Sequence, residues 1–224
     1  MIRGLPMPVD IHLKHIPIYQ RAQYDKGGIG RIYWNYRDNL AFSCIGKRDA
    51  RVVDVGCGEG ITLEKAGRLF PEKCFIGIDG LEENLLICRN HHLDVAAGNV
   101  YQLPFKNDAL DCIFLLEVIE HLAEPEKALT EMHRILKPQG RMVMIFPNDA
   151  VFKIARLLTL KLKEAFYDPG HLRQWTPWDM RVFLNHQGFR ILKQKNIPFF
   201  IWHLSLHHLV VCEKRIDWIR EDIL

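Results

Sequence analysis

Short apolar runs alternate with amphipathic stretches along the chain from about residue 51. The runs rich in β-branched and other apolar residues predict strands over 51–56, 74–79, 94–99, 111–117 and 141–146. Between them, apolar positions three and four residues apart predict helices over 61–70, 82–90 and 125–136. Strands and helices that alternate with short links predict a parallel sheet with helices on both faces.

The last part of the chain breaks this alternation. A helix is predicted over 178–187, and strands are predicted over 189–196 and 208–213. The connection between these two strands is too short for a helical crossover, so we expect them to be antiparallel neighbours. The pattern therefore predicts a parallel α/β sheet that ends in an antiparallel hairpin.

Composition excludes several classes of protein. The chain has 224 residues, of which 48% are hydrophobic and 25% charged, as in ordinary globular domains rather than disordered chains or coiled coils. A net charge of +3 gives no reason to expect DNA as a partner and does not favour RNA. The six cysteines form no CxxC pair, and no apolar leader or membrane span is recognisable, so a cytoplasmic protein is expected.

A glycine-rich turn follows the first predicted strand, where residues 52–60 read VVDVGCGEG. Gly56 and Gly58 allow a tight turn against which a ligand can lie directly. The third glycine, Gly60, comes one place too early for a dinucleotide fingerprint, and no phosphate-binding GK[ST] follows. Asp79 ends the second strand, where an acidic residue can reach the hydroxyls of a ribose. The pattern predicts a nucleoside-bearing cofactor whose glycine-loop portion is not a pyrophosphate.

Further motifs along the chain extend this pattern. They are Asp54-x-Gly-x-Gly-x-Gly60, Asp79, Gly98-Asn99, Leu103-Pro-Phe105, Asp111 to His121, and Arg134 to Gly140. In this order they resemble the motifs of class I S-adenosylmethionine-dependent methyltransferases, and most of all the ubiquinone/menaquinone-biosynthesis-type branch. The resemblance is strong over about 50–148 and weaker over 168–177. It implies a seven-stranded Rossmann-like sheet, mostly parallel with a terminal antiparallel strand, and helices on both faces.

The same resemblance implies S-adenosyl-L-methionine as the cofactor and assigns residues to it. The expected cofactor-binding residues are Asp54, Gly56, Gly58, Gly60, Asp79, Gly80, Asn99, Val100 and Glu117. Within this set, Asp54 is expected at the methionine part and Asp79 at the ribose. Asn99 is expected to accept from the adenine amine, and Glu117 to lie by the sulfonium.

Two histidines are the predicted catalytic residues, His121 and His171. His121 follows the fourth strand, at the edge where such sheets bind ligands, and is the first candidate for a base. The alternative interpretation is that His121 is a polar residue at a helix start that only orients Glu117.

A metal-dependent alternative arises from the same residues. Glu117, Glu120, His121 and His171 resemble the set with which small-RNA 3′-terminal 2′-O-methyltransferases hold a divalent metal. Similar strings are common in the metal-free quinone-type branch, and the chain has no basic cluster in its core. The sequence therefore favours a site without metal and a small or lipid-like acceptor. RNA methylation and a non-catalytic cofactor-binding subunit remain the alternatives.

We expect a single methyltransferase domain with four segments: an N-terminal cap over 1–50, a cofactor-binding core over 51–148, an insertion or lid over 149–176, and a C-terminal helix and hairpin over 177–224. The aromatic residues of the cap are expected to cover the cofactor site, the alternative being a helix packed on the sheet edge. Residues 151–167 carry one apolar and one basic arc. They predict a lid over an apolar acceptor or a peripheral contact with a membrane, the alternative being an ordinary packed helix.

Overall fold

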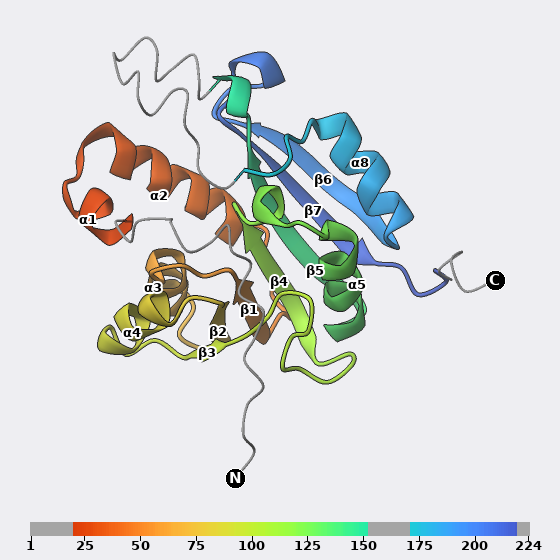
Figure 1. Ribbon diagram of the computed structural model, residues 1–224, viewed down its shortest axis with the longest axis horizontal. Coiled ribbons are helices and arrows are strands. Elements are labelled where there is room, and N and C mark those ends of the chain that lie inside the picture. The colour runs from red at the N-terminus through yellow and green to blue at the C-terminus, as the bar shows by residue number, and fades with distance from the viewer. Residues whose placement is uncertain (1–19, 152–170, 219–224) are drawn as a thin grey trace.

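The computed structural model describes residues 20–151 and 171–218, which form one seven-stranded sheet with helices around it (Figure 1). The strands are β1 (Arg51–Val55), β2 (Cys74–Asp79), β3 (Val95–Ala97), β4 (Leu110–Leu116), β5 (Leu136–Pro147), β6 (Phe189–Ile197) and β7 (His207–Lys214). The helices within the described residues are α1 (Gln20–Asp25), α2 (Gly28–Phe42), α3 (Ile61–Leu69), α4 (Glu82–Asn90), α5 (Pro125–Ile135) and α8 (Pro177–His186), with 3₁₀ turns η2 (Ile119–His121) and η3 (Trp202–Leu204).

The strand order is β3-β2-β1-β4-β5-β7-β6. Strands β1 to β5 pair in parallel, whereas β7 is antiparallel to both β5 and β6. The predicted mostly parallel sheet with a terminal antiparallel strand is confirmed. The last strand of the chain lies inside the sheet, and β6 forms the edge. Their residues explain this order, because β7 is apolar and buried on both faces while β6 carries exposed charged residues.

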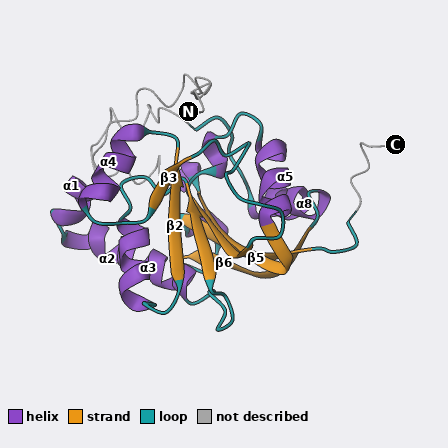
Figure 2. Ribbon diagram, turned by 90° about the horizontal axis from the view of Figure 1, so that it is seen from below, coloured by secondary structure: helices purple, strands orange, loops and turns teal. Residues whose placement is uncertain are grey.

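Two apolar layers hold the helices on the sheet (Figure 2). On one face, side chains of α2 and α3 pack on β1, β4, β5 and β7, and on the other face α5 and α8 pack on the same strands. The predicted apolar stripe of α5 is confirmed, since Ala128, Leu129, Met132 and Ile135 are fully buried. The helix ends at Ile135 because the next residues lead into Pro138, which favours extended backbone before it. As a result β5 begins at Leu136, earlier than the sequence predicts.

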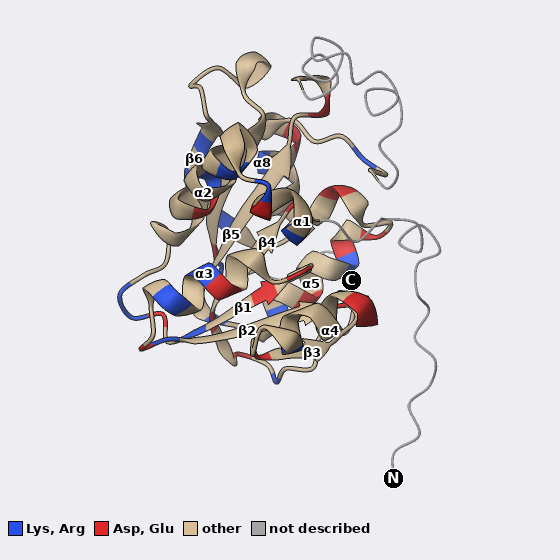
Figure 3. Cartoon of the chain, turned by 90° about the vertical axis from the view of Figure 1, so that its left-hand side faces the viewer, with Lys and Arg blue, Asp and Glu red and all other residues tan. Residues whose placement is uncertain are grey.

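Several predictions about the outer segments concern residues that the structure does not describe. The predicted insertion helix over 151–167 lies outside the described residues except for its first position. The division of the chain into four segments stays a prediction. Among the described helices, none combines the length and the apolar character needed to cross a bilayer. On the face seen in Figure 3, described Lys and Arg residues are interspersed with Asp and Glu.

The strand order reverses between β1 and β4, because β2 and β3 lie on one side and β5 to β7 on the other. In open α/β sheets, ligands bind outside the carboxyl ends of the strands at such a reversal. The ends of β1, β2 and β4 carry Gly56, Asp79 and Glu117, so the fold brings the predicted cofactor residues to this edge.

Candidate active site

The turn that joins β1 to α3 contains three glycines in a backbone conformation that other residues rarely adopt. Gly56, Gly58 and Gly60 have φ angles of 76°, 55° and 74°. At Gly56 the space is also closed, because an added Cβ would lie 2.5 Å from Cγ2 of Val118. The Gly56 amide donates to the carbonyl of Ile78 at 2.7 Å, which fixes the turn to the end of β2. The turn therefore presents bare backbone at the edge of the sheet, as a closely bound ligand requires.

Asp79 ties the glycine turn to the turn that follows β2. Its Oδ2 accepts from the Gly58 amide at 2.8 Å, and its Oδ1 accepts from the Leu81 amide at 2.9 Å and from Asn84 Nδ2 at 3.2 Å. A carboxylate has about four lone-pair positions, so it can still accept from a ligand hydroxyl. Asp79 thus organises the loop in addition to its predicted contact with ribose.

Helix α1 lies directly on the glycine turn. The backbone amides of Gln20 and Arg21 donate to the buried carboxylate of Glu59 at 2.6 and 2.8 Å. The Arg21 guanidinium also donates to the Glu59 carbonyl at 2.7 Å. A Cβ added at Gly58 would lie 2.6 Å from Oε1 of Gln20. These contacts hold the described part of the N-terminal segment against the predicted cofactor site.

Asp54, near the end of β1, is a buried carboxyl group whose neighbours in the sequence are both valines. Burial raises its pKa to about 7, and the negative charges of Asp38 and Asp79 add to this effect while Arg37 opposes it. A bound cation would favour the ionised form. A contact between Asp54 and the ammonium group of a ligand stays a prediction.

The predicted adenine side is less enclosed. Oδ1 of Asn99 accepts from the Tyr101 amide at 2.9 Å, which leaves its second lone pair for a ligand. Val100 is half-buried and packs on the core, while Gly80 is exposed. A Cβ at Gly80 would lie 3.9 Å from the carbonyl of Gly98. The roles of these residues toward adenine stay predictions.

Glu117 follows β4 with a positive φ of 57° and has a cation and a histidine at its carboxylate. Arg37 of α2 donates to its Oε1, and Nε2 of His207 lies 3.3 Å from the same oxygen. Burial alone would raise the pKa of Glu117, but the positive charge of Arg37 and the adjacent His207 outweigh burial and hold the pKa well below its usual range. Glu117 is therefore an ionised carboxylate at the ligand-binding edge.

The network continues on both sides of Glu117. The Tyr33 hydroxyl lies 2.6 Å from Nδ1 of His207, with which it forms a hydrogen bond. Arg37 donates from Nε and NH2 to Oδ1 of Asp38 at 3.0 and 2.8 Å. The Thr62 hydroxyl donates to Oδ2 of Asp38 at 3.1 Å, which links α2 to α3. A chain of polar contacts therefore joins β7, β4, α2 and α3 beneath the site.

Sequence reasoning missed several members of this network: Arg37, Asp38, Thr62 and His207. The adjacent Arg37 and Asp38 in a helix resemble an ordinary exposed ion pair, and only their burial shows otherwise. His207 is one of several histidines that interrupt the last apolar stretch. Nothing in the chain near Glu117 indicates that these residues become its partners.

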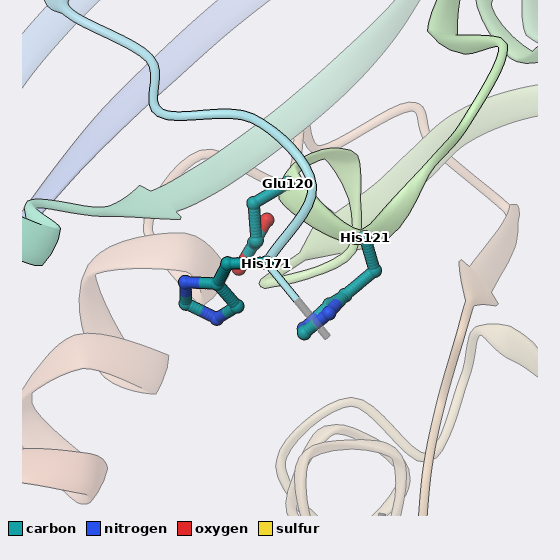
Figure 4. Close-up of side chains that lie close together, drawn as sticks. All are labelled: Glu120, His121 and His171. Carbon is teal, nitrogen blue, oxygen red and sulfur yellow. The ribbon is translucent and has the colours of Figure 1, made fainter. Parts of the chain in front are cut away.

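Both predicted catalytic histidines lie close together beside Glu120, His121 in η2 and His171 in the segment that begins there (Figure 4). The possible ligand atoms of Glu120, His121 and His171 all lie within 4.8 Å of one another. The rings of the two histidines meet edge to face, with centroids 4.7 Å apart. Burial and the negative charge of Glu117 raise the pKa of Glu120 to about 8. Nδ1 of His171 lies 2.8 Å from Oδ1 of Asp149, a residue that sequence reasoning did not select.

Comparisons with known proteins agree with this geometry. Residues 53–144 match the family model described as a methyltransferase domain. The chain is 26% identical over 163 residues to a probable S-adenosylmethionine-dependent methyltransferase of Mycolicibacterium smegmatis, a match that covers 71% of this chain and 60% of that one. It is 29% identical over 150 residues to the ubiquinone/menaquinone biosynthesis C-methyltransferase of Vibrio vulnificus, covering 58% and 55%. The chain thus spans less than two thirds of the length of these relatives.

A solved structure shows the same fold at low sequence identity. The structure of an S-adenosylmethionine-dependent methyltransferase from Archaeoglobus fulgidus superposes with a TM-score of 0.66 at 16% identity. The superposition covers 88% of this chain and 100% of that one.

Proposed function

We propose that the protein transfers a methyl group to a small or lipid-like acceptor, starting from the match of residues 53–144 to the methyltransferase domain family, which agrees with the sequence motifs. The family and the fold imply S-adenosyl-L-methionine as the cofactor. The observation that carries the proposal is the glycine turn with two buried carboxyl groups, Asp54 and Asp79, at the edge where the strand order reverses.

The residues at this edge fit the cofactor. The three positive φ angles leave a backbone cradle that side chains would fill, and Gly56 admits no Cβ at all. Asp54 would stabilise the ammonium of the methionine part, and Asp79 would accept from the ribose hydroxyls. Glu117 would contribute a fixed negative charge near the sulfonium. When bound, the cofactor supplies an electrophilic methyl group.

On the acceptor side the chain has to orient the acceptor and to take up a proton where the nucleophile carries one. His121 follows β4 on the same turn as Glu117, and His171 lies against it. His121 is our candidate to accept the proton, and the Asp149 carboxylate holds His171 in place.

The loop between β6 and β7 supports an apolar acceptor. Phe199, Phe200 and Ile201 are exposed on it, and Phe200 is 92% exposed. Asn148, which follows β5, fixes the loop to the ligand-binding edge because its Nδ2 donates to the Trp202 carbonyl at 2.8 Å. The relative from Vibrio vulnificus is named for ubiquinone/menaquinone biosynthesis, which also supports a lipid-like acceptor.

Incubation of a cell extract with the protein and S-adenosylmethionine labelled on the methyl group tests the proposal. We expect a labelled product that partitions into organic solvent. The matched control is Gly56→Ala, whose Cβ would collide with Val118 and close the cradle, and it should form no labelled product. If calorimetry shows binding of S-adenosylmethionine but no labelled product forms in any fraction, the chain is a non-catalytic cofactor-binding subunit.

Binding of S-adenosylmethionine should depend on pH through Asp54. Because its raised pKa of about 7 leaves it protonated in mild acid, the carboxyl loses its attraction for an ammonium as the pH falls. We expect affinity about tenfold weaker at pH 6 than at pH 7.5 by calorimetric titration. Asp54→Asn, which cannot ionise, should bind more weakly at pH 7.5 and show a flat profile. An equal slope in the wild type and in Asp54→Asn would assign the pH dependence to another group.

A further inference from the structure

The turn after β4 and the segment at residue 171 bring one carboxylate and two imidazoles together. Glu120 and His121 are consecutive in η2, which directly follows Glu117 and Val118. The backbone amide of Leu172 donates to the Glu120 carbonyl at 2.8 Å, so the segment that contains His171 is fixed against this turn. This backbone contact explains why ligand atoms from residues 50 positions apart in sequence lie within 4.8 Å of one another.

Among the residues that the structure describes, Glu120 has no partner that explains its burial. Its exposed fraction is 1%, and among the described residues neither carboxylate oxygen has a hydrogen-bond partner. A buried carboxylate without hydrogen bonds is costly, so such groups are normally paired or bind a metal. The two histidines beside it offer ring nitrogens, which ligate a metal when the imidazole is neutral.

A second carboxylate is within hydrogen-bond distance of one of the two histidines. Oδ1 of the buried Asp149 lies 2.8 Å from Nδ1 of His171. When Nδ1 donates its proton to a carboxylate, Nε2 becomes the nitrogen that can ligate a metal. Carboxylate–histidine pairs of this kind orient metal-binding imidazoles in proteins.

We propose that Glu120, His121 and His171 bind a divalent transition-metal ion. Two imidazoles and one carboxylate suit manganese, cobalt, iron and zinc better than magnesium, which prefers oxygen ligands only. Three protein ligands leave at least one coordination position open for an oxygen atom of another molecule.

The position of the site gives the ion a role that rests on the proposed function. Glu117, expected near the sulfonium, lies only three residues before Glu120 on the same turn. The open position then binds a hydroxyl oxygen of the acceptor and lowers the pKa of that hydroxyl, whose proton leaves to water. His121 in this case is a metal ligand and not the base. The acceptor class that follows is a hydroxyl compound methylated on oxygen.

The test measures metal binding itself and does not depend on the methyl-transfer reaction. The full chain is treated with chelator, freed of it, and titrated with Mn²⁺ by calorimetry and electron paramagnetic resonance. We expect one Mn²⁺ per chain, tighter binding of Co²⁺ and Zn²⁺, and the weakest binding of Mg²⁺. Glu120→Gln and His171→Asn should each weaken Mn²⁺ binding at least about tenfold, and Asp149→Asn about tenfold through the orientation of His171.

Glu124→Gln is the matched control, since this carboxylate lies in the same connection but is exposed and outside the cluster. It should bind Mn²⁺ as the wild type does. Calorimetry with S-adenosylmethionine on the same samples verifies that each variant is folded. Lack of Mn²⁺ binding in the wild type, or equal binding in all variants, would overturn the metal site and leave the proposed function intact. Metal binding without any methyl transfer would overturn the proposed function and leave the metal site.

Discussion

Arg37→Met is expected to lower the free energy of unfolding by about 3 kcal/mol, because it removes the cation that lies between the buried carboxylate of Asp38 and the partly exposed carboxylate of Glu117. Arg37 binds Glu117 and Asp38, and the side chain of Asp38 is fully buried. Methionine has a similar length and no charge, so the loss comes from the missing cation at the two carboxylates rather than from a cavity. Lys65 still pairs with Asp38 in this variant. Urea unfolding followed by circular dichroism measures the change, and an unaltered m-value shows that the unfolded state is the same.

The control for this prediction is an exposed ion pair of the same type. Arg190 on β6 pairs with Glu213 on β7, and the Arg190 side chain is 66% exposed. Arg190→Met should cost less than about 1 kcal/mol, since exposed pairs contribute little. In the double variant Arg37→Met/Glu117→Gln, part of the lost stability should return, because one of the two carboxylates that lost Arg37 no longer carries a charge. Equal small losses in both arginine variants would show that the Glu117–Arg37–Asp38 network does not stabilise the fold.

The cofactor edge could be predicted from the sequence because its signals are local. A glycine turn directly after a strand, and an acidic residue at the end of the next strand, are both set by a few neighbouring residues. Parallel pairing then places the ends of β1 and β2 side by side, so Gly58 and Asp79 come within hydrogen-bond distance without further information. The antiparallel last strand was predictable in the same way, from the short connection before it.

The partners of Glu117 could not be predicted, since they come from distant segments. Arg37 precedes Glu117 by 80 residues and His207 follows it by 90, and neither lies in a motif. Which face of α2 turns inward depends on its packing against α3 and the sheet, which hydrophobic periodicity does not determine for a helix with aromatic residues on several sides. Asp149 was missed for a related reason, because its significance depends on where the segment containing His171 packs.

Asp79→Ala is expected to weaken S-adenosylmethionine binding by about 1.5–3 kcal/mol, roughly 10- to 150-fold. The side chain has two tasks in the structure, since it accepts from the Gly58 and Leu81 amides and is predicted to accept from the ribose hydroxyls. Its removal therefore loses a charge-assisted hydrogen bond to the ligand and also one of the contacts that hold the glycine turn on β2. Calorimetric titration of the wild type and the variant measures the loss, and thermal unfolding verifies that the variant is folded.

Asn84→Ala is the control for Asp79→Ala, because it leaves both tasks of Asp79 in place. Asn84 Nδ2 donates to Oδ1 of Asp79 at 3.2 Å, so its removal leaves the carboxylate and both of its amide contacts in place. We expect Asn84→Ala to change S-adenosylmethionine affinity less than about threefold, the effect of one neutral donor to an already well-bonded carboxylate. Asp79→Asn retains one acceptor oxygen but loses the charge, and its affinity should fall between those of Asn84→Ala and Asp79→Ala. If Asp79→Ala binds as tightly as the wild type, the ribose lies elsewhere and Asp79 serves only to shape the loop.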